Sequence, residues 1–79
     1  MDWSNDNCPV CRGSAREALP RMGDFAEIIC DSCGRYRISG TAIEVMRHDD
    51  DDARRTRILE QAKLDANDGA IPFVQSYMT

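Results

Sequence analysis

Four cysteines are the residues of this chain whose types and spacing point most directly to chemistry. They form the pattern C-x2-C-x18-C-x2-C, with Cys8, Cys11, Cys30 and Cys33 as the candidate ligands. Two residues between cysteines let a tight turn aim both sulfurs at one tetrahedral ion, at ~2.3 Å each. The interval between the pairs also matches zinc sites. We therefore expect one structural Zn²⁺ held by four thiolates.

The residues that follow each pair predict how the two turns are built. Gly34 comes directly after Cys33 and suits a positive φ. Arg12 holds the equivalent place in the first turn and is followed by Gly13, so the first turn should differ slightly. Backbone N–H groups in such turns can point at the thiolates and partly offset their charge.

A redox function is the main alternative for the cysteines. A thioredoxin-like C-x-x-C follows an apolar strand and opens a helix within a βαβ unit. Here the polar segment WSNDN precedes the first pair, and 79 residues hold no βαβ pattern. A site with four cysteine ligands also has no open position for catalysis. We therefore expect a protein that is not an enzyme.

The compartment expected from the sequence is the cytoplasm. The first seven residues are polar and acidic, without the apolar run of a signal peptide. No apolar stretch is long enough to span a membrane, so we expect no membrane association. Thiols in a reducing cytosol favour metal binding over disulfides.

A chain of 79 residues predicts a single domain, 1–79, with a marginal core. Structural zinc sites contribute ~10–16 kcal/mol, which is comparable with the ~5–15 kcal/mol stability of a typical domain. The metal is therefore expected to decide whether the N-terminal part folds.

Three short segments of the N-terminal part predict strands. Residues 15–19 and 25–29 are short β-like runs separated by a Pro- and Gly-containing turn, and residues 35–39 alternate in polarity. Alternation puts Tyr36 in the core and leaves Arg35 and Arg37 as a modest basic edge. The alternative is a nucleic-acid surface in which these arginines grip phosphates and Tyr36 stacks a base.

The C-terminal part has helical periodicity. Thr41 followed by Glu44 is a capping-box pattern, which predicts a short helix to about Arg47. Residues 53–68 predict a longer helix that ends near Gly69. The residues expected on its buried face recur at helical spacing and are Ile58, Leu59, Ala62 and Ala66.

Charged residues around the second helix favour a structural interpretation. The acidic run in residues 48–52 suits a helix N-terminus and lacks the spacing of a calcium loop. The only histidine, His48, lies in this charged run and not in an evident catalytic pocket. We expect Arg54, Arg55 and Arg57 to pair with nearby acids on a solvated face; the alternative is a recognition helix.

The last ten residues form an apolar tail. Pro72 prevents continuation of the helix across Ile71. We expect the tail to fold back on the helices or to be an exposed patch that binds a partner. Its large apolar side chains are Phe73, Val74, Tyr77 and Met78.

The segments CPVC and GDFAEIICDSCGRYRISGTAIE give the chain a family resemblance. They resemble the small four-cysteine zinc-ribbon modules found at the N-terminus of many uncharacterised bacterial and phage proteins. The resemblance covers residues 8 to about 45 and, more loosely, the following helix through Ile71 and Pro72. It implies the metal role of the four cysteines and the ribbon fold, and no particular activity.

The fold class expected is α+β, with an N-terminal zinc ribbon of antiparallel hairpins in residues 1–40 and two helices and the tail in 41–79. The function expected is a protein–protein interaction module, for which a phage or mobile-element modulator of a host machine is one setting. Four thiolates and one Zn²⁺ would take the formal charge from −4 to −6, which disfavours the alternative, a nucleic-acid binder. Partner identity and oligomeric state stay open. The candidate partner-binding residues are Arg35, Arg37, Phe73 and Tyr77.

Overall fold

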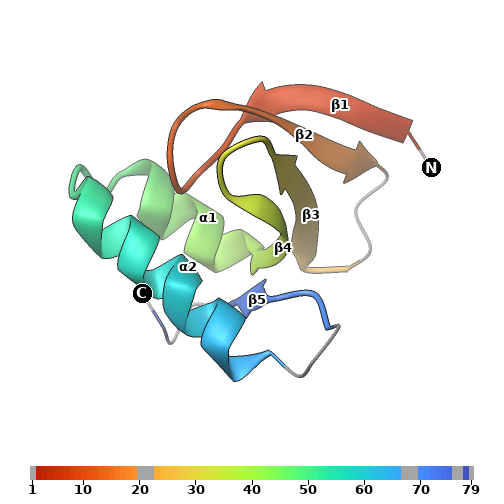
Figure 1. The fold of residues 1–79 in the computed structure, drawn as a ribbon. Helices are drawn as coiled ribbons and strands as arrows, with labels where there is room; N and C mark the ends of the chain where they lie inside the picture. Colours follow the sequence, from red (N-terminus) through yellow and green to blue (C-terminus); the bar gives the residue numbers. More distant parts are fainter. Residues whose placement is uncertain (1, 20–22, 67–69, 76–77, 79) are drawn as a thin grey trace.

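The computed structural model describes residues 2–19, 23–66, 70–75 and 78 of the chain. Within these residues, four strands precede two helices, which confirms the α+β class (Figure 1). In chain order the elements are β1 (Asp2–Asn7), β2 (Ser14–Leu19), β3 (Phe25–Cys30), β4 (Gly34–Ser39), α1 (Gly40–Arg47), α2 (Asp52–Asp65) and β5 (Phe73–Val74).

In the described part of the chain, five strands form one sheet in the order β1-β2-β3-β4-β5. The strands from β1 to β4 pair antiparallel, and β5 pairs with β4 in parallel. The strands predicted at 15–19, 25–29 and 35–39 are therefore confirmed. The register pairs Asn7 with Ser14 and Ala15 with Cys30. It thereby brings the β1–β2 turn and the β3–β4 turn, which carry the two cysteine pairs, to the same end of the sheet.

Strand β1 corrects the sequence analysis, which predicts no strand in residues 2–7. The segment DWSNDN is polar and rich in residues that are depleted in strands. Six residues of antiparallel pairing with β2 outweigh this weak local preference, and Trp3 lies opposite Ala18. Among the described residues, β1 forms one edge of the sheet.

Helix α1 is capped two residues earlier than the sequence predicts. Ser39 is the N-cap instead of Thr41, and its hydroxyl oxygen accepts the backbone N–H of Ala42 at 3.2 Å. Because Ser39 also ends β4, the strand runs directly into the helix without a loop. Glu44 consequently lies beyond the N3 position and takes no part in a capping box.

Helix α2 starts close to its predicted position, with an acidic N-terminus. Asp51 is its N-cap, and the carboxylate accepts the backbone N–H of Arg54 at 3.1 Å. The helix ends at Asp65, earlier than predicted, and Gly69 lies outside the described residues. Ala66, which the sequence places on the buried face, is the half-buried C-cap.

The core lies between one face of the sheet and the two helices. Tyr36 and Ile38 are fully buried there, which confirms that Tyr36 belongs to the core. They belong to a single cluster that includes Met46 of α1 and Leu59 of α2. This cluster also contains Cys8 and Cys30, so the cysteine turns adjoin the core.

Arg55 contradicts the prediction that the arginines of α2 share a solvated face. Its side chain is only 1% exposed, whereas Arg54 and Arg57 are exposed. The reason is its spacing, because Arg55 precedes the buried residues Ile58 and Leu59 by three and four positions. Arg55 therefore continues the buried face of α2 by one turn toward its N-terminus.

The C-terminal tail returns to the sheet. Phe73 and Val74 form β5 beside Arg37 and Ile38 of β4, and Val74 is fully buried. The backbone N–H of Arg37 donates to the carbonyl oxygen of Pro72 at 2.8 Å. The described part of the tail is therefore packed within the fold.

Candidate metal centre

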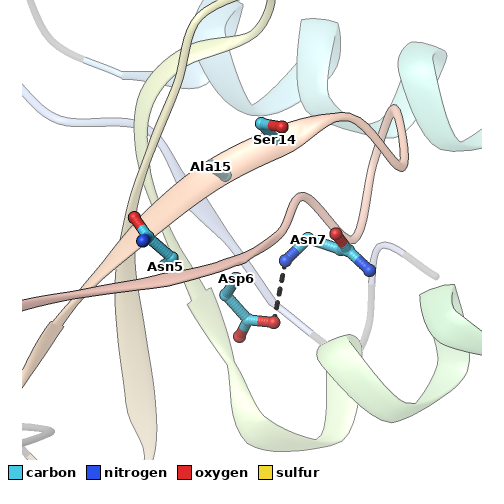
Figure 2. A pocket seen from close by; sticks show the side chains of 5 residues that line it. All are labelled: Asn5, Asp6, Asn7, Ser14 and Ala15. Carbon is cyan, nitrogen blue, oxygen red and sulfur yellow. Dashed lines mark hydrogen bonds between the residues drawn. The ribbon is translucent and has the colours of Figure 1, made fainter.

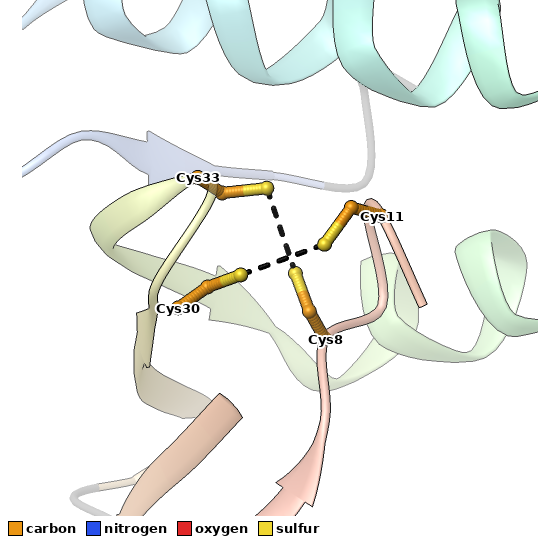
Figure 3. Close-up of side chains that lie close together, drawn as sticks. All are labelled: Cys8, Cys11, Cys30 and Cys33. Atoms are coloured by element: carbon orange, nitrogen blue, oxygen red, sulfur yellow. Dashed lines mark hydrogen bonds between the residues drawn. The ribbon is translucent and has the colours of Figure 1, made fainter. Parts of the chain in front are cut away.

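The four cysteine side chains point at a common centre (Figure 3). All four sulfurs lie within 4.8 Å of one another, and every thiol is free. The sulfur of Cys8 is 3.8 Å from that of Cys33, and the sulfur of Cys11 is 3.5 Å from that of Cys30. Four sulfurs bound to one tetrahedral ion at ~2.3 Å would be separated by ~3.8 Å. The arrangement can therefore hold a single metal ion.

The two turns that carry the thiols share a backbone feature. Gly34 has the predicted positive φ, at 84°, and Arg12 has a φ of 67° at the equivalent place in the first turn. The first turn is closed by hydrogen bonds from Arg12 N–H to the Cys8 carbonyl and from Cys8 N–H to the Gly13 carbonyl, each 2.8 Å. Both turns thus reverse through a left-handed residue immediately after their second cysteine.

Electrostatics at the thiols set the conditions for a bound cation. Burial alone would raise the pKa of Cys30, but hydrogen bonds from the backbone N–H groups of Cys33 and Ser32 and from the Cys11 and Cys8 thiols together outweigh it and lower that pKa. Burial raises the pKa of Cys33, and the negative charge of Cys8 raises it further. Without a cation, four thiolates in this space repel one another, so a divalent ion would stabilise the ionised cluster.

Tyr36 contributes a hydroxyl to the centre. Its oxygen lies 3.0 Å from the Cys8 sulfur, and both residues are 0% exposed. Burial and the neighbouring sulfur raise the pKa of Tyr36, so the phenol stays protonated at neutral pH. A protonated hydroxyl beside a thiolate acts as the hydrogen-bond donor.

Two arginines connect the first cysteine turn to the helices. Arg12 donates to the carbonyl oxygens of Met46, Arg47 and Asp49, at 3.0, 2.9 and 2.7 Å. The Nε of Arg55 donates to the carbonyl oxygen of Val10, inside the turn, at 2.7 Å. Arg55 also donates to the Asp49 carbonyl and pairs with Asp52. The turn is therefore fixed to the end of α1 and the start of α2.

The candidate partner-binding arginines lie on the face of the sheet opposite the one that carries Tyr36. Arg35 and Arg37 both donate to Glu27, at 2.6 and 3.1 Å. Glu27 is only 6% exposed; burial would raise its pKa, but these two hydrogen bonds outweigh burial and lower it. The two arginines are therefore held side by side by one ionised carboxylate.

The two aromatic candidates for partner binding are Phe73 and Tyr77. The Phe73 ring is 36% exposed and packs against Phe25, with ring centroids 5.3 Å apart. Tyr77 lies outside the described residues.

Sequence reasoning identified the four thiols and missed the three side chains that support them. A buried tyrosine needs a hydrogen-bond partner, and this requirement was a usable signal for Tyr36. For Arg55 the signal was its place in the apolar stripe of the helix. For Arg12 it was the alignment of the two turns, which puts an arginine where the second turn has glycine.

In comparisons with known proteins, no family model, no curated protein and no solved structure matches the chain. Within the described ranges, no helix is long and apolar enough to cross a membrane. The four-cysteine cluster defines a small domain with a candidate metal site.

Proposed function

We propose that the four cysteines hold one structural Zn²⁺ and that the protein is a non-enzymatic, zinc-stabilised interaction module. The observation that carries the zinc assignment is the near-tetrahedral spacing of four free sulfurs. Thiolate-rich sites favour Zn²⁺ over Mg²⁺ or Ca²⁺, which prefer oxygen ligands. Four protein ligands close the coordination sphere, so the ion stabilises the fold and leaves no open site for a substrate.

The partner that we propose is another protein. The nucleic-acid alternative relied on the arginines of α2 and on Arg35 and Arg37. Arg55 is buried and Arg54 pairs with Asp49 at 3.2 Å, so α2 offers a weaker basic face than its sequence implied. The formal charge of −4, or −6 with zinc and four thiolates, opposes binding to a polyanion. Small size and acidity also fit a modulator carried by a phage or mobile element.

Metal analysis tests the zinc assignment. Native mass spectrometry of protein purified under reducing conditions should find one Zn²⁺ per chain. A chelator should then abolish the near-UV circular dichroism spectrum, because zinc-site energies of ~10–16 kcal/mol rival the whole stability of a domain. A reduced, metal-free chain that stays folded would refute the structural role.

Affinity capture tests the interaction role. Zinc-loaded protein should retain a specific protein from the lysate of its source organism, and mass spectrometry should identify it. The same bait with all four cysteines changed to serine should lose that protein. Recovery of nucleic acid alone would favour the alternative function.

A further inference from the structure

The outer face of the sheet is the face opposite α1 and α2 (Figure 1). Side chains alternate along each strand, and directly paired residues point to the same face. The pairing of Arg16 with Ile29, of Ile29 with Arg35 and of Arg37 with Phe73 therefore defines this face. Its central members, from β1 to β4, are Trp3, Asn5, Arg16, Glu27, Ile29, Arg35 and Arg37.

The outer face is basic although the chain is acidic. Among the described residues, its centre carries Arg16, Arg35 and Arg37 against one carboxylate, that of Glu27. Glu27 uses its two oxygens to orient two guanidinium groups, each of which has five N–H donors and uses one here. The other donors of Arg35 and Arg37 can face a ligand. Asp31 adds a second carboxylate at the rim. The face still carries three arginines against two carboxylates and is therefore net positive.

Aromatic side chains flank these arginines at both edges of the sheet. Trp3 is 40% exposed on β1, and Phe73 is 36% exposed on β5. Phe25 packs on Phe73, and the Arg37 guanidinium lies 5.4 Å above the Phe25 ring. Exposed tryptophan, phenylalanine and arginine are the residues enriched in protein interfaces and their hot spots.

A groove runs along the β1–β2 edge of the sheet and reaches the outer face over β2 and β3. Its larger part, about 610 Å³, is lined by Asn5, Asp6, Asn7, Ser14 and Ala15 (Figure 2). Of these, Asp6 and Ala15 belong to the inner face, where Asp6 pairs with Arg47 of α1 at 3.4 Å. An adjoining hollow of about 280 Å³ shares three of these residues and adds Arg16, Ile29 and Asp31. On the outer face the groove thus offers the amides of Asn5 and Asn7 on β1 and the hydroxyl of Ser14 on β2. The side chains of Arg16, Ile29 and Asp31 follow.

We propose that the outer face binds a protein segment that presents carboxylates next to aromatic or aliphatic side chains. The carboxylates would engage Arg16 and Arg35, and the apolar side chains would cover Ile29 and Trp3. The inference rests on the proposed interaction function and names its surface and partner chemistry. Mixed apolar and arginine composition favours a protein over nucleic acid, since three arginines on an acidic molecule neutralise few phosphates.

Selection from a displayed library of short random peptides tests the chemistry of the partner. Zinc-loaded wild-type protein is the bait, and recovered peptides are re-measured by fluorescence anisotropy at about 0.15 M salt. We expect peptides enriched in Asp or Glu together with aromatic or aliphatic residues. Their affinity should fall about tenfold or more in Arg16→Gln/Arg35→Gln, because hot-spot arginines contribute that much to binding.

Matched variants locate the surface. Arg57→Gln removes an exposed arginine from α2 and should leave affinity unchanged. Trp3→Ala should weaken binding without altering zinc content, which separates a lost contact from a lost fold. Peptides that bind all variants equally would overturn the surface while leaving the interaction function intact. Failure to select any peptide would count against both.

A binding assay with nucleic acid tests the competing ligand of the outer face. Fluorescein-labelled oligothymidine should show no binding at the same salt concentration. Micromolar binding that is lost in Arg16→Gln/Arg35→Gln would overturn the proposal and assign the outer face to single-stranded nucleic acid. Enrichment of Lys- or Arg-rich peptides would equally refute an acid-bearing partner.

Discussion

At the residue scale, the hydroxyl of Tyr36 gives Cys8 a side-chain donor at short range. Cys11 instead accepts the backbone N–H of Gly13 at 3.4 Å, whereas Cys8 has the phenol at 3.0 Å. A donor aimed at a metal-bound thiolate offsets part of its charge and fixes the direction of the sulfur. Because the phenol is buried, it stays in place through packing as well as through the hydrogen bond.

Tyr36→Phe is expected to weaken zinc binding while preserving the core. The ring remains and only the donor is lost, so the effect should appear in metal affinity, by about 10- to 100-fold. Competition with a chromophoric chelator measures it. Cys8→Ser is the reference for loss of a ligand and should be more severe. Equal affinity of Tyr36→Phe and wild type would reduce the hydroxyl to a space-filling role.

Arg12 combines an unfavourable backbone with favourable side-chain contacts. A non-glycine residue at φ 67° costs about 1 kcal/mol or more. Its guanidinium donates to the carbonyl oxygens of Met46 and Arg47 at the end of α1, where a positive charge also suits the helix dipole, and to that of Asp49 just beyond the helix. Arginine therefore persists where the second turn uses glycine.

Two single substitutions of Arg12 separate the backbone strain from the side-chain contacts. Arg12→Ala loses the contacts and keeps the strain, whereas Arg12→Gly loses both. We expect both variants to be less stable than wild type, with the glycine variant more stable than the alanine variant by about 1 kcal/mol. Urea denaturation of the zinc-loaded proteins measures the difference. The opposite order would show that the turn is unstrained at this position.

At the element scale, the junction between α1 and α2 is fixed by Arg55. The Arg55 side chain donates hydrogen bonds to the Val10 carbonyl of the first cysteine turn, to the Asp49 carbonyl of the interhelical connection and to the Asp52 carboxylate. Asp52 is 86% exposed, so the ion pair is screened and the buried carbonyls matter more.

Arg55→Met keeps an unbranched chain in the buried stripe and removes the donors. We expect a loss of about 2 kcal/mol or more, because the buried Val10 carbonyl loses its partner. Thermal unfolding of the zinc-loaded protein measures this loss. Arg57→Met, on the exposed side of the same helix, should change stability by less than about 0.5 kcal/mol. Similar effects of the two substitutions would contradict a special role for Arg55.

The elements that the sequence predicted well are those where local pattern and tertiary packing agree. Strand β4 shows this, since alternation places Tyr36 inward and Arg35 outward. Strand β1 could not be predicted, because its stability comes from pairing with β2 and not from its polar sequence. The cap of α1 was ambiguous between Ser39 and Thr41, and only the direct strand-to-helix path selects Ser39.

At the cysteine centre, the sequence predicts the four candidate ligands but not the side chains that support them. Spacing alone specifies which four thiols meet. The supports come from residues distant in the chain, such as Arg55 on Val10, so only the folded arrangement defines them. Burial of Arg55 depends on acceptors supplied by three different segments, and no local pattern encodes that coincidence.

At the scale of the whole molecule, the cysteine turns and the helices share one core. Residues from both parts belong to the same cluster, from Cys8 and Val10 to Leu59 and Val74. The chain passes between the antiparallel strands and the helices twice: at Ser39, where β4 runs into α1, and again after α2, where β5 returns to pair with β4. Loss of the metal should therefore disturb the packing of the helices as well as the turns.

The tail returns to the sheet as β5 and fills part of the core. Val74 is 0% exposed, and burial of such a side chain contributes ~1.5–3 kcal/mol. Val74→Asp would place a carboxylate in the core and should lower the thermal midpoint markedly; deletion of residues 72–79 should do the same. The neighbouring Gln75 is exposed, so Gln75→Asp adds the same charge as a matched control and should have little effect.

Differential scanning calorimetry of the zinc-loaded proteins, with size-exclusion chromatography of each, distinguishes core from interface. If the tail is part of the core, Val74→Asp and the deletion lose stability as monomers, and Gln75→Asp behaves like wild type. If the tail serves only as an interface, the deletion keeps its thermal midpoint and loses self-association or partner binding. A deletion that changes neither property would show that β5 contributes nothing in solution, against the burial of Val74 and the hydrogen bond from Arg37 to Pro72.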